Sequence, residues 1–307
     1  MALLGLLAFA LFLTGCSVDT APTTAVLNAD SVSSPVRLLI TRDFGAQVLL
    51  DTTAPHADGM TAMSLLASAT EVETGYGGGF VGAIDGLAST FGRSGASAPH
   101  DWFYWVDGSL GEVGAGDHAL VAGQTVWWDY HPWSGAAMIQ STLAAFPRPF
   151  SVAPVQVLGP DTAAALREWL AEAGVETALP HDHDGPDAGD VPGAGHAAAA
   201  YTLDTGLPTW VMEALKAGAR AGIFAQVNGE RLQVLTEQGD VEGPAEAIAL
   251  AVRNPSAPDA LVLLVLASDQ ASLEAFLQQI SPGDLSGHVG VYLSDDAVQT
   301  LPAGAGS

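Results

Sequence analysis

Cysteine and basic residues are scarce in this chain of 307 residues. Its single cysteine, Cys16, rules out a disulfide within the chain and a cysteine-cluster metal site. Only 9 lysines and arginines stand against 34 aspartates and glutamates, which gives a formal net charge of -25. So acidic a chain repels phosphate backbones and anionic lipid headgroups, and this excludes nucleic-acid binding and polybasic membrane attachment.

The apolar run at the start of the chain is short. Residues 2–13 have the length of a signal-peptide core and fall below the about 20 residues that a membrane-spanning helix needs. The run is followed by Thr14-Gly-Cys16, and Leu13-Thr-Gly-Cys16 resembles the lipobox of bacterial lipoproteins. The resemblance implies a signal peptide over residues 1–16, a lipid on Cys16, and a position on the extracytoplasmic side of the cell membrane. An N-terminal helix buried in the fold is the alternative.

The rest of the chain divides by composition. Residues 17–35 are rich in Ser, Thr, Ala and Pro, which predicts a flexible tether. With 49% hydrophobic residues, the remainder can form two full-sized cores, and we expect one domain over residues 36–135 and another over 136–302. The expected fold class is α+β, with a sheet-and-helix domain followed by an α/β layer domain.

Strands and helices are expected at the following positions. In the first domain, strands are predicted over 36–41, 47–51, 101–106 and 125–133, and a helix capped by Asp58 has Ala62, Met63, Leu66 and Ala69 on one face. In the second domain, strands are predicted over 152–158, 260–266 and 288–293, with a hairpin of 223–227 and 231–235 around Asn228-Gly229. Helices are predicted from an Asp161 cap to Gly174, over 209–221 and 244–252, and from a Ser268 cap to Pro282.

Large aromatic residues gather in two of the predicted strands. Five of the seven tryptophans lie between residues 102 and 133. Strand alternation places Trp102, Tyr104 and Val106 on one face and Phe103 and Trp105 on the other; in the later strand it separates Val126, Trp128 and Tyr130 from Trp127, Asp129 and His131. Rings on both faces indicate a platform for a flat or amphipathic ligand. A second packed layer, or contact with the second domain, is the alternative.

The same region carries a family resemblance. The series Tyr76-Gly77, Phe80-Val81, Ile84-Asp-Gly-Leu87, Trp102-x-Tyr-x-Val-Asp-Gly108 and Gly123-x-x-Val-x-Trp-x-Tyr130 resembles the transcobalamin C-terminal domain family, whose bacterial members are mostly lipoproteins of unknown function. It covers about a third of the chain. The resemblance implies a β-grasp-like fold, with a helix packed on a small curled sheet. It also implies contact with one face of a corrinoid through backbone groups and aromatic side chains. Nothing in the sequence resembles the helical barrel that closes the other face in the vertebrate carriers.

These observations lead to a binding hypothesis. We expect a membrane-anchored lipoprotein that captures a small molecule, with cobalamin or a related corrinoid as the candidate ligand and a transporter subunit as a partner to which it is delivered. No cofactor is required. The candidate binding residues are Tyr76, Gly77, Phe80, Val81, Trp102, Tyr104, Trp105, Trp127, Trp128 and Trp133. An envelope protein-interaction module, with tryptophans as the contact surface, is the alternative.

Metal binding and catalysis have weaker support. His181-Asp-His-Asp begins a loop that runs to Asp190, with His196 beyond it, and these residue types bind transition metals. Because the loop is rich in Gly and Pro, it has no fixed geometry, and divalent-metal scavenging by residues 181–196 is a further alternative. No G-x-S-x-G or H-E-x-x-H motif is present, and Asp101, Asp107 and Asp129 are poorly suited to act as a carboxylate pair on a sugar. We therefore expect no enzyme activity.

Overall fold

The computed structural model describes residues 34–75, 79–90, 99–133, 138–159, 162–178 and 192–305. Cys16, the tether, Tyr76, Gly77 and residues 181–190 of the His/Asp loop lie outside the described residues. Residues Ser33–Ser307 form one compact unit. Among the described residues, no helix is both long and apolar enough to span a bilayer.

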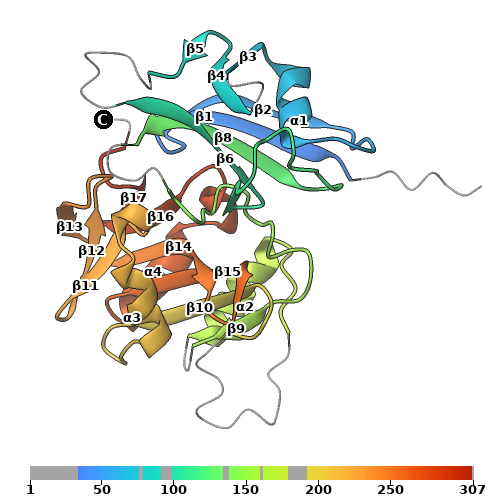
Figure 1. Ribbon diagram of the computed structural model, residues 1–307. Coiled ribbons are helices and arrows are strands. Elements are labelled where there is room, and N and C mark those ends of the chain that lie inside the picture. Colours follow the sequence, from blue (N-terminus) through green and yellow to red (C-terminus); the bar gives the residue numbers. More distant parts are fainter. Residues whose placement is uncertain are drawn as a thin grey trace, which may run out of the picture. The chain divides into compact units, whose positions relative to one another are not determined.

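The first sheet has the strand order β2-β1-β8-β6-β7 (Figure 1). Its strands are β1 (Val36–Arg42), β2 (Gln47–Ala54), β6 (His100–Val106), β7 (Ser109–Leu110) and β8 (Thr125–Pro132). The central pair, β1 and β8, is parallel, and the other pairs are antiparallel. Helix α1 (Ala62–Ala69) and a small sheet of β3 (Val72–Gly75), β4 (Phe80–Ile84) and β5 (Leu87–Ala88) share a core with one face of this sheet. A helix therefore packs on one face of the first sheet.

Helix α1 begins one residue after its N-cap, Thr61, which forms a capping box with Ser64. Thr61 Oγ1 accepts from Ser64 N at 3.1 Å, and Ser64 Oγ accepts from Thr61 N at 2.8 Å. The predicted cap Asp58 is wrong, because the cap must immediately precede the first helical residue. Ala62 and Leu66 face the core as expected, whereas Ala69 is exposed.

A two-residue turn, Asp107-Gly108, connects β6 to β7. Asp107 and Gly108 both have positive φ, at 48° and 81°, as a two-residue type I′ turn requires. Gly108 is also needed for space, because a Cβ there would lie 2.5 Å from the carbonyl oxygen of Thr142. The aromatic strand β6 is therefore held in a fixed position against the segment that leads into the second half of the chain.

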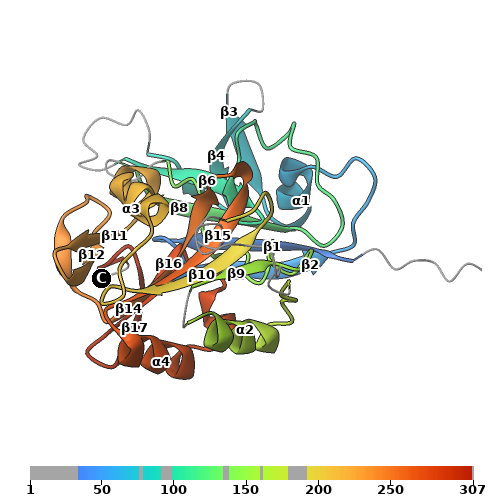
Figure 2. The same ribbon diagram turned by 90° about the horizontal axis from the view of Figure 1, so that it is seen from below.

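The second sheet has the strand order β17-β16-β14-β15-β10-β9 and is mixed. Its strands are β9 (Gln156–Leu158), β10 (Ala197–Thr202), β14 (Ala247–Asn254), β15 (Ala257–Ala267), β16 (Gly290–Ser294) and β17 (Ala297–Leu301). Helices α2 (Ala163–Glu172) and α4 (Gln270–Gln279) lie together on one face (Figure 2). The other face shares its core with the first sheet, with α3 (Thr209–Lys216), and with a small sheet of β11 (Ala225–Asn228), β12 (Arg231–Leu235) and β13 (Val241–Pro244). The α+β class is confirmed.

Several element predictions in this half need correction. Residues 244–252 are not a helix, because β14 pairs with β15 and β16 along this stretch and is buried on both faces. Long-range strand pairing thus overrides the helix propensity of its alanines. The helix predicted over 209–221 ends at Lys216 and is followed by a separate 3-10 turn over 219–221. Asp269 rather than Ser268 caps α4, and Thr162 occupies the N-cap of α2.

The hairpin prediction is confirmed with a shifted loop. Asn228 pairs with Arg231, so the loop residues are Gly229 and Glu230. Strand β10 is absent from the predictions, since Ala197–Ala200 is a run of four alanines, which are depleted in strands.

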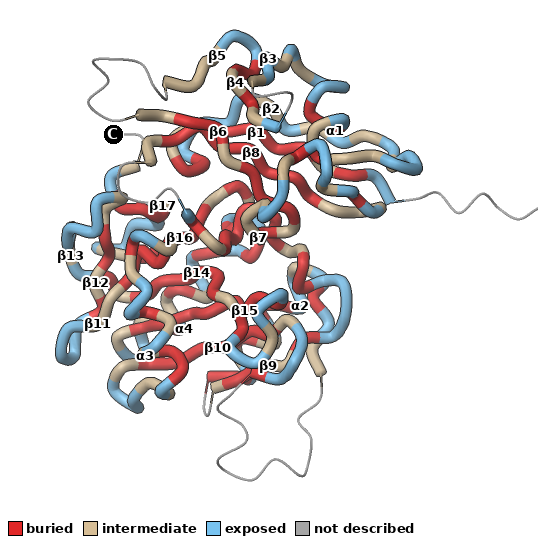
Figure 3. The backbone as a smooth tube through the Cα atoms, viewed as in Figure 1, coloured by how far each residue is buried: buried red, intermediate tan, exposed pale blue. Residues whose placement is uncertain are grey.

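The buried residues form three layers of core (Figure 3). The first lies between α1 with its small sheet and the first sheet, the second between the two large sheets, and the third between the second sheet and helices α2 and α4. The first sheet is thus covered on both faces. We call the side toward α1 its helix face and the side toward the second sheet its inter-sheet face.

Candidate binding pocket on the helix face

The aromatic strands β6 and β8 place their rings as alternation predicts. Trp102, Tyr104, Trp128 and Tyr130 belong to the core on the helix face, while Trp105 and Trp127 belong to the core on the inter-sheet face. All six rings are buried, with at most 9% of any residue exposed. The two faces nevertheless differ in how completely the rings are enclosed and in what their polar atoms contact.

Trp105 and Trp127 are core residues between the two sheets. Their ring centroids lie 4.5 Å apart. Trp105 Nε1 donates to the carbonyl oxygen of Ile139 at 2.8 Å, and Trp127 Nε1 donates to Thr41 Oγ1 at 2.7 Å. Neither ring is available as a platform or as a protein contact surface, so for these two residues the structure shows the packed-layer alternative.

A buried ionic group lies on the same inter-sheet face. Asp129 is fully buried and accepts from Phe44 N at 2.9 Å, Gly45 N at 3.0 Å, His131 Nδ1 at 2.8 Å and the hydroxyl of Thr41. His131 stacks between Phe44 and Phe103, with centroid distances of 4.5 Å and 4.6 Å. The group ties the turn after β1 to strand β8. The sequence places Asp129 and His131 on one face, but no pattern in it indicates their partners.

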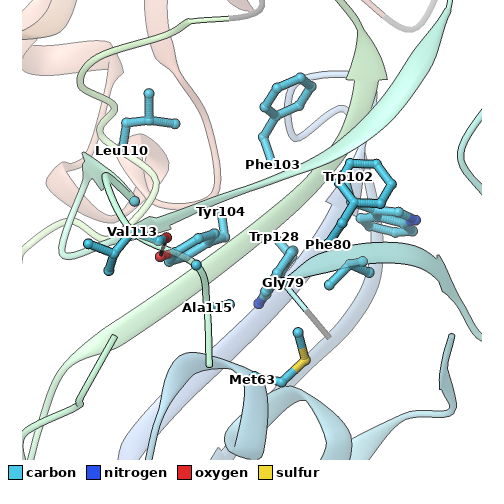
Figure 4. Close-up of a pocket in the computed structure, with 13 residues that line it drawn as sticks. Met63, Gly79, Phe80, Trp102, Phe103, Tyr104, Leu110, Val113, Ala115 and Trp128 are labelled. Atoms are coloured by element: carbon cyan, nitrogen blue, oxygen red, sulfur yellow. Dashed lines mark hydrogen bonds between the residues drawn. The ribbon is translucent and has the colours of Figure 1, made fainter. Parts of the chain in front are cut away.

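A pocket of about 180 Å³ opens beside the rings of the helix face (Figure 4). It is lined by residues from α1, β4 with the residue before it, β6, β7, β8 and the loop that follows β7: Met63, Gly79, Phe80, Val81, Trp102, Phe103, Tyr104, Leu110, Gly111, Val113, Gly114, Ala115 and Trp128. None of these residues carries a formal charge at neutral pH. Its uncharged lining favours a small uncharged group, and its volume is below the about 300–1,000 Å³ of pockets that hold whole drug-sized ligands.

Most of the polar side-chain atoms around the pocket are already paired. Tyr104 Oη donates to the carbonyl oxygen of Val113 at 2.5 Å, and Trp102 Nε1 donates to that of Leu87 at 2.9 Å. Burial, followed by the nearby negative charge of Asp117, raises the pKa of Tyr104 to about 12, so the phenol stays protonated. By contrast, Trp128 Nε1 is buried and has no hydrogen-bond acceptor among the described residues.

Tyr104 depends on a glycine for its position. A Cβ on Gly111 would lie 2.1 Å from Tyr104 Cζ. The Tyr104 ring also stacks on Trp128, with centroids 5.0 Å apart and an interplanar angle of 28°. The pocket wall is therefore an ordered aromatic stack built on adjacent strands.

Half of the predicted binding residues meet at this pocket. Phe80, Val81, Trp102, Tyr104 and Trp128 line it, whereas Trp133 lies beyond the end of β8 and is not part of its lining. Trp105 and Trp127 lie on the other face, and Tyr76 and Gly77 are outside the described residues. The sequence reasoning missed Met63 and the loop from Leu110 to Ala115. Alternation within strands cannot show which loop closes over a sheet face.

Two other hollows among the described residues are smaller than this pocket. One of about 120 Å³ is lined by Asp43, His100, Glu237 and the segment 302–305, among others, and burial raises the pKa of Glu237. Another of about 160 Å³ lies between α3 and β14 beside Arg253. Within the part of the chain that the structure describes, no three His, Cys, Asp or Glu residues are grouped to hold a metal ion.

The segment that contains the pocket matches a known family model. Residues 59–132, about a quarter of the chain, match a family model described as "Domain of unknown function (DUF4430)". Every residue that lines the pocket lies within this match. No curated protein and no solved structure matches the chain.

Proposed function

We propose that this protein is a lipid-anchored binding protein on the extracytoplasmic side of the cell membrane, which captures a small molecule through the helix-face pocket. The observation that carries the proposal is the pocket itself, which is uncharged, walled by stacked aromatic rings, and contained within the segment matched to a family. The lipobox-like Leu13-Thr-Gly-Cys16 supports the anchor. The protein acts as a carrier rather than an enzyme and delivers its ligand to a transporter subunit.

The pocket volume limits how much of a ligand enters. A cavity of about 150 Å³ holds benzene, while whole drug-sized ligands occupy about 300–1,000 Å³. A pocket of about 180 Å³ therefore accepts one ring or a group of that size. The rest of a larger ligand would lie outside it, against the surface.

The ligand proposed for testing is cobalamin or a related corrinoid. Support comes from the resemblance of residues 76–130 to the transcobalamin C-terminal domain family. Because a corrinoid is far larger than the pocket, only a peripheral group would enter, and the ring system would contact the rim.

The experiment uses the soluble chain without residues 1–16, titrated with hydroxocobalamin and followed by visible absorbance and calorimetry. We expect a spectral change and heat of binding, and both should be lost in Ala115→Leu, which fills the pocket. Ala69→Leu, on the exposed end of α1, is the matched control and should bind normally. No binding of any corrinoid at millimolar concentration would remove corrinoids as the ligand.

The lipid anchor has an independent test. Cells that express the full chain in the presence of radioactive palmitate should label the protein, and Cys16→Ser should remove the label and release the protein from the membrane fraction. Equal labelling of the variant would refute the anchor while leaving the pocket proposal intact.

A further inference from the structure

The Trp128 indole sets a chemical requirement on whatever enters the pocket. Trp128 is only 2% exposed, lines the pocket, and has no acceptor for Nε1 among the described residues. In Figure 4 the nitrogen edge of its ring points toward the side of the pocket formed by Met63 and Ala115. A buried N–H without an acceptor costs about 1–3 kcal/mol, and such groups are rare in folded proteins.

Other tryptophans in the fold show how unusual this is. Trp102, Trp105, Trp127 and Trp169 each donate from Nε1 to an oxygen at 2.7–2.9 Å. Trp127, the sequence neighbour of Trp128, reaches Thr41 on the opposite face. A group bound in the cavity can therefore supply the hydrogen-bond acceptor that the Trp128 N–H lacks.

We propose that Trp128 is the specificity-determining donor of the pocket, and that the group it selects is an uncharged ring bearing one hydrogen-bond acceptor, such as a ring nitrogen or a carbonyl oxygen. This inference rests on the proposed binding function of the pocket and adds the chemistry of the bound group. The stacked Tyr104 and Trp128 rings favour a flat group, and the volume of about 180 Å³ admits a single ring.

The acceptor is neutral because the pocket offers nothing to balance a negative charge. None of the lining residues is Lys, Arg or His. The nearby Asp117 carboxylate already acts on Tyr104, and the chain carries a net charge of -25. A carboxylate or phosphate would lose its hydration here without gaining an ionic partner, which is strongly unfavourable.

A second unpaired nitrogen in the fold does not offer the same opportunity. His131 Nε2 has no hydrogen-bond partner among the described residues. Its ring is enclosed between Phe44 and Phe103, and it lines none of the three hollows described above. Of these two nitrogens, Trp128 Nε1 is therefore the one whose residue lines a described hollow.

The experiment compares pyridine with benzene at pH 8, where pyridine is neutral. The two rings have nearly the same shape and differ in one acceptor. In the soluble chain without residues 1–16, labelled with ¹⁵N, the indole resonance that is missing from Trp128→Phe identifies Trp128. We expect pyridine to move this resonance downfield and benzene to leave it near its free position.

The affinities give the quantitative test. The ratio of pyridine to benzene affinity should fall about tenfold in Trp128→Phe, as expected for loss of one buried hydrogen bond. Using a ratio removes the intrinsic difference in hydrophobicity between the two rings. Trp169→Phe, whose indole donates to the carbonyl oxygen of Ile280 in a different core, is the matched control and should leave the ratio unchanged. An unchanged ratio in Trp128→Phe, or equal shifts with both rings, would overturn the proposal.

If Trp128→Phe does not fold, Ala115→Leu replaces it, and the pyridine shift should then disappear because the pocket is filled. A shift that persists in Ala115→Leu also overturns the proposal.

The outcome of this experiment can be distinguished from the outcome of the test of the proposed function. Corrinoid binding that is unaffected by Trp128→Phe keeps the carrier function and rejects the donor role. A Trp128-dependent pyridine site without corrinoid binding keeps the donor role and rejects the corrinoid.

Discussion

Trp127 and Trp128 are adjacent in strand β8 and almost equally buried, yet they lie in different surroundings. Trp127 faces the second sheet, and its indole donates to Thr41, which in turn donates to Asp129. Trp128 faces α1 and borders a pocket, and its indole donates to no described residue. One face of the sheet is therefore closed by a hydrogen-bonded ionic group, and the other is left partly unfilled.

The two faces of this sheet therefore differ in role: the inter-sheet face contributes to stability, and the helix face offers a space for a ligand. On the inter-sheet face, the rings of Trp105 and Trp127 are enclosed, and the Asp129 carboxylate accepts from four donors of the protein itself. On the helix face, the wall is supplied by a loop and a short helix, and the packing leaves a space of about 180 Å³.

The largest expected effect comes from removing the charge on the closed face. Asp129→Ala should lower the free energy of unfolding by about 3–5 kcal/mol, because it leaves His131 and two backbone N–H groups without their acceptor. Urea denaturation measures the change. Tyr130→Phe on the other face, which loses one hydrogen bond to Ala88, is the control and should cost about 1 kcal/mol. Equal losses in the two variants would contradict the distinction between the faces.

A smaller effect is expected from overfilling the wall of the pocket. Gly111→Ala should cost up to about 3 kcal/mol and displace the Tyr104 ring, since the new Cβ would lie 2.1 Å from it. Gly114→Ala is matched, because it lines the same pocket and its Cβ would have no neighbour closer than 3.7 Å. Thermal melting monitored by near-ultraviolet circular dichroism distinguishes them. A tolerated Gly111→Ala would show that the ring is not confined as described.

The two neighbouring tryptophans can be compared directly. Trp127→Phe should be less stable than Trp128→Phe by about 1 kcal/mol or more, because the first loses a formed hydrogen bond and the second removes an unpaired donor. Both variants remove the same atoms, so the difference in free energy of unfolding reports mainly on the hydrogen bond. A Trp128→Phe variant that is the less stable of the two would indicate that its indole is paired in solution.

The smallest effect is a dependence on pH at the alkaline end. The pKa of Tyr104 is raised from its usual value of about 10 to about 12, chiefly by burial. The folded state thus keeps a proton that the unfolded state loses, and the associated stability is complete below pH 10 and decreases as the pH rises toward 12. Urea denaturation between pH 9 and 12 should show a steeper decline for the wild type than for Tyr104→Phe. Parallel curves would contradict the raised pKa.

Local patterns in the sequence predict on which face of the first sheet a side chain lies. They do not predict which other elements pack against that face. Alternation assigns Trp102 and Trp128 to one face and Trp105 and Trp127 to the other, as observed. It cannot show that a second sheet covers the latter pair, because that contact joins residues more than a hundred positions apart, such as Phe44 and Phe224.

The same limit explains the errors in the second half of the chain. The alanine-rich segments 197–200 and 247–251 favour helix by composition, and they become strands through pairing with β15 and its neighbours. The pocket shares this origin, because its lining brings residues 110–115 together with α1, β4 and β8 through tertiary contacts. Its aromatic wall was predictable, and its opening and the unpaired Trp128 indole were not.

Contact between a bound ring and the Trp128 indole is the most direct test of the account. Intermolecular nuclear Overhauser effects, measured from pyridine protons to the indole N–H protons of the ¹⁵N-labelled protein, report on it. We predict effects to the Trp128 N–H and none to that of Trp127, which is enclosed between the sheets. Effects to Trp127, or to neither residue at saturating pyridine, would contradict a ligand pocket on the helix face.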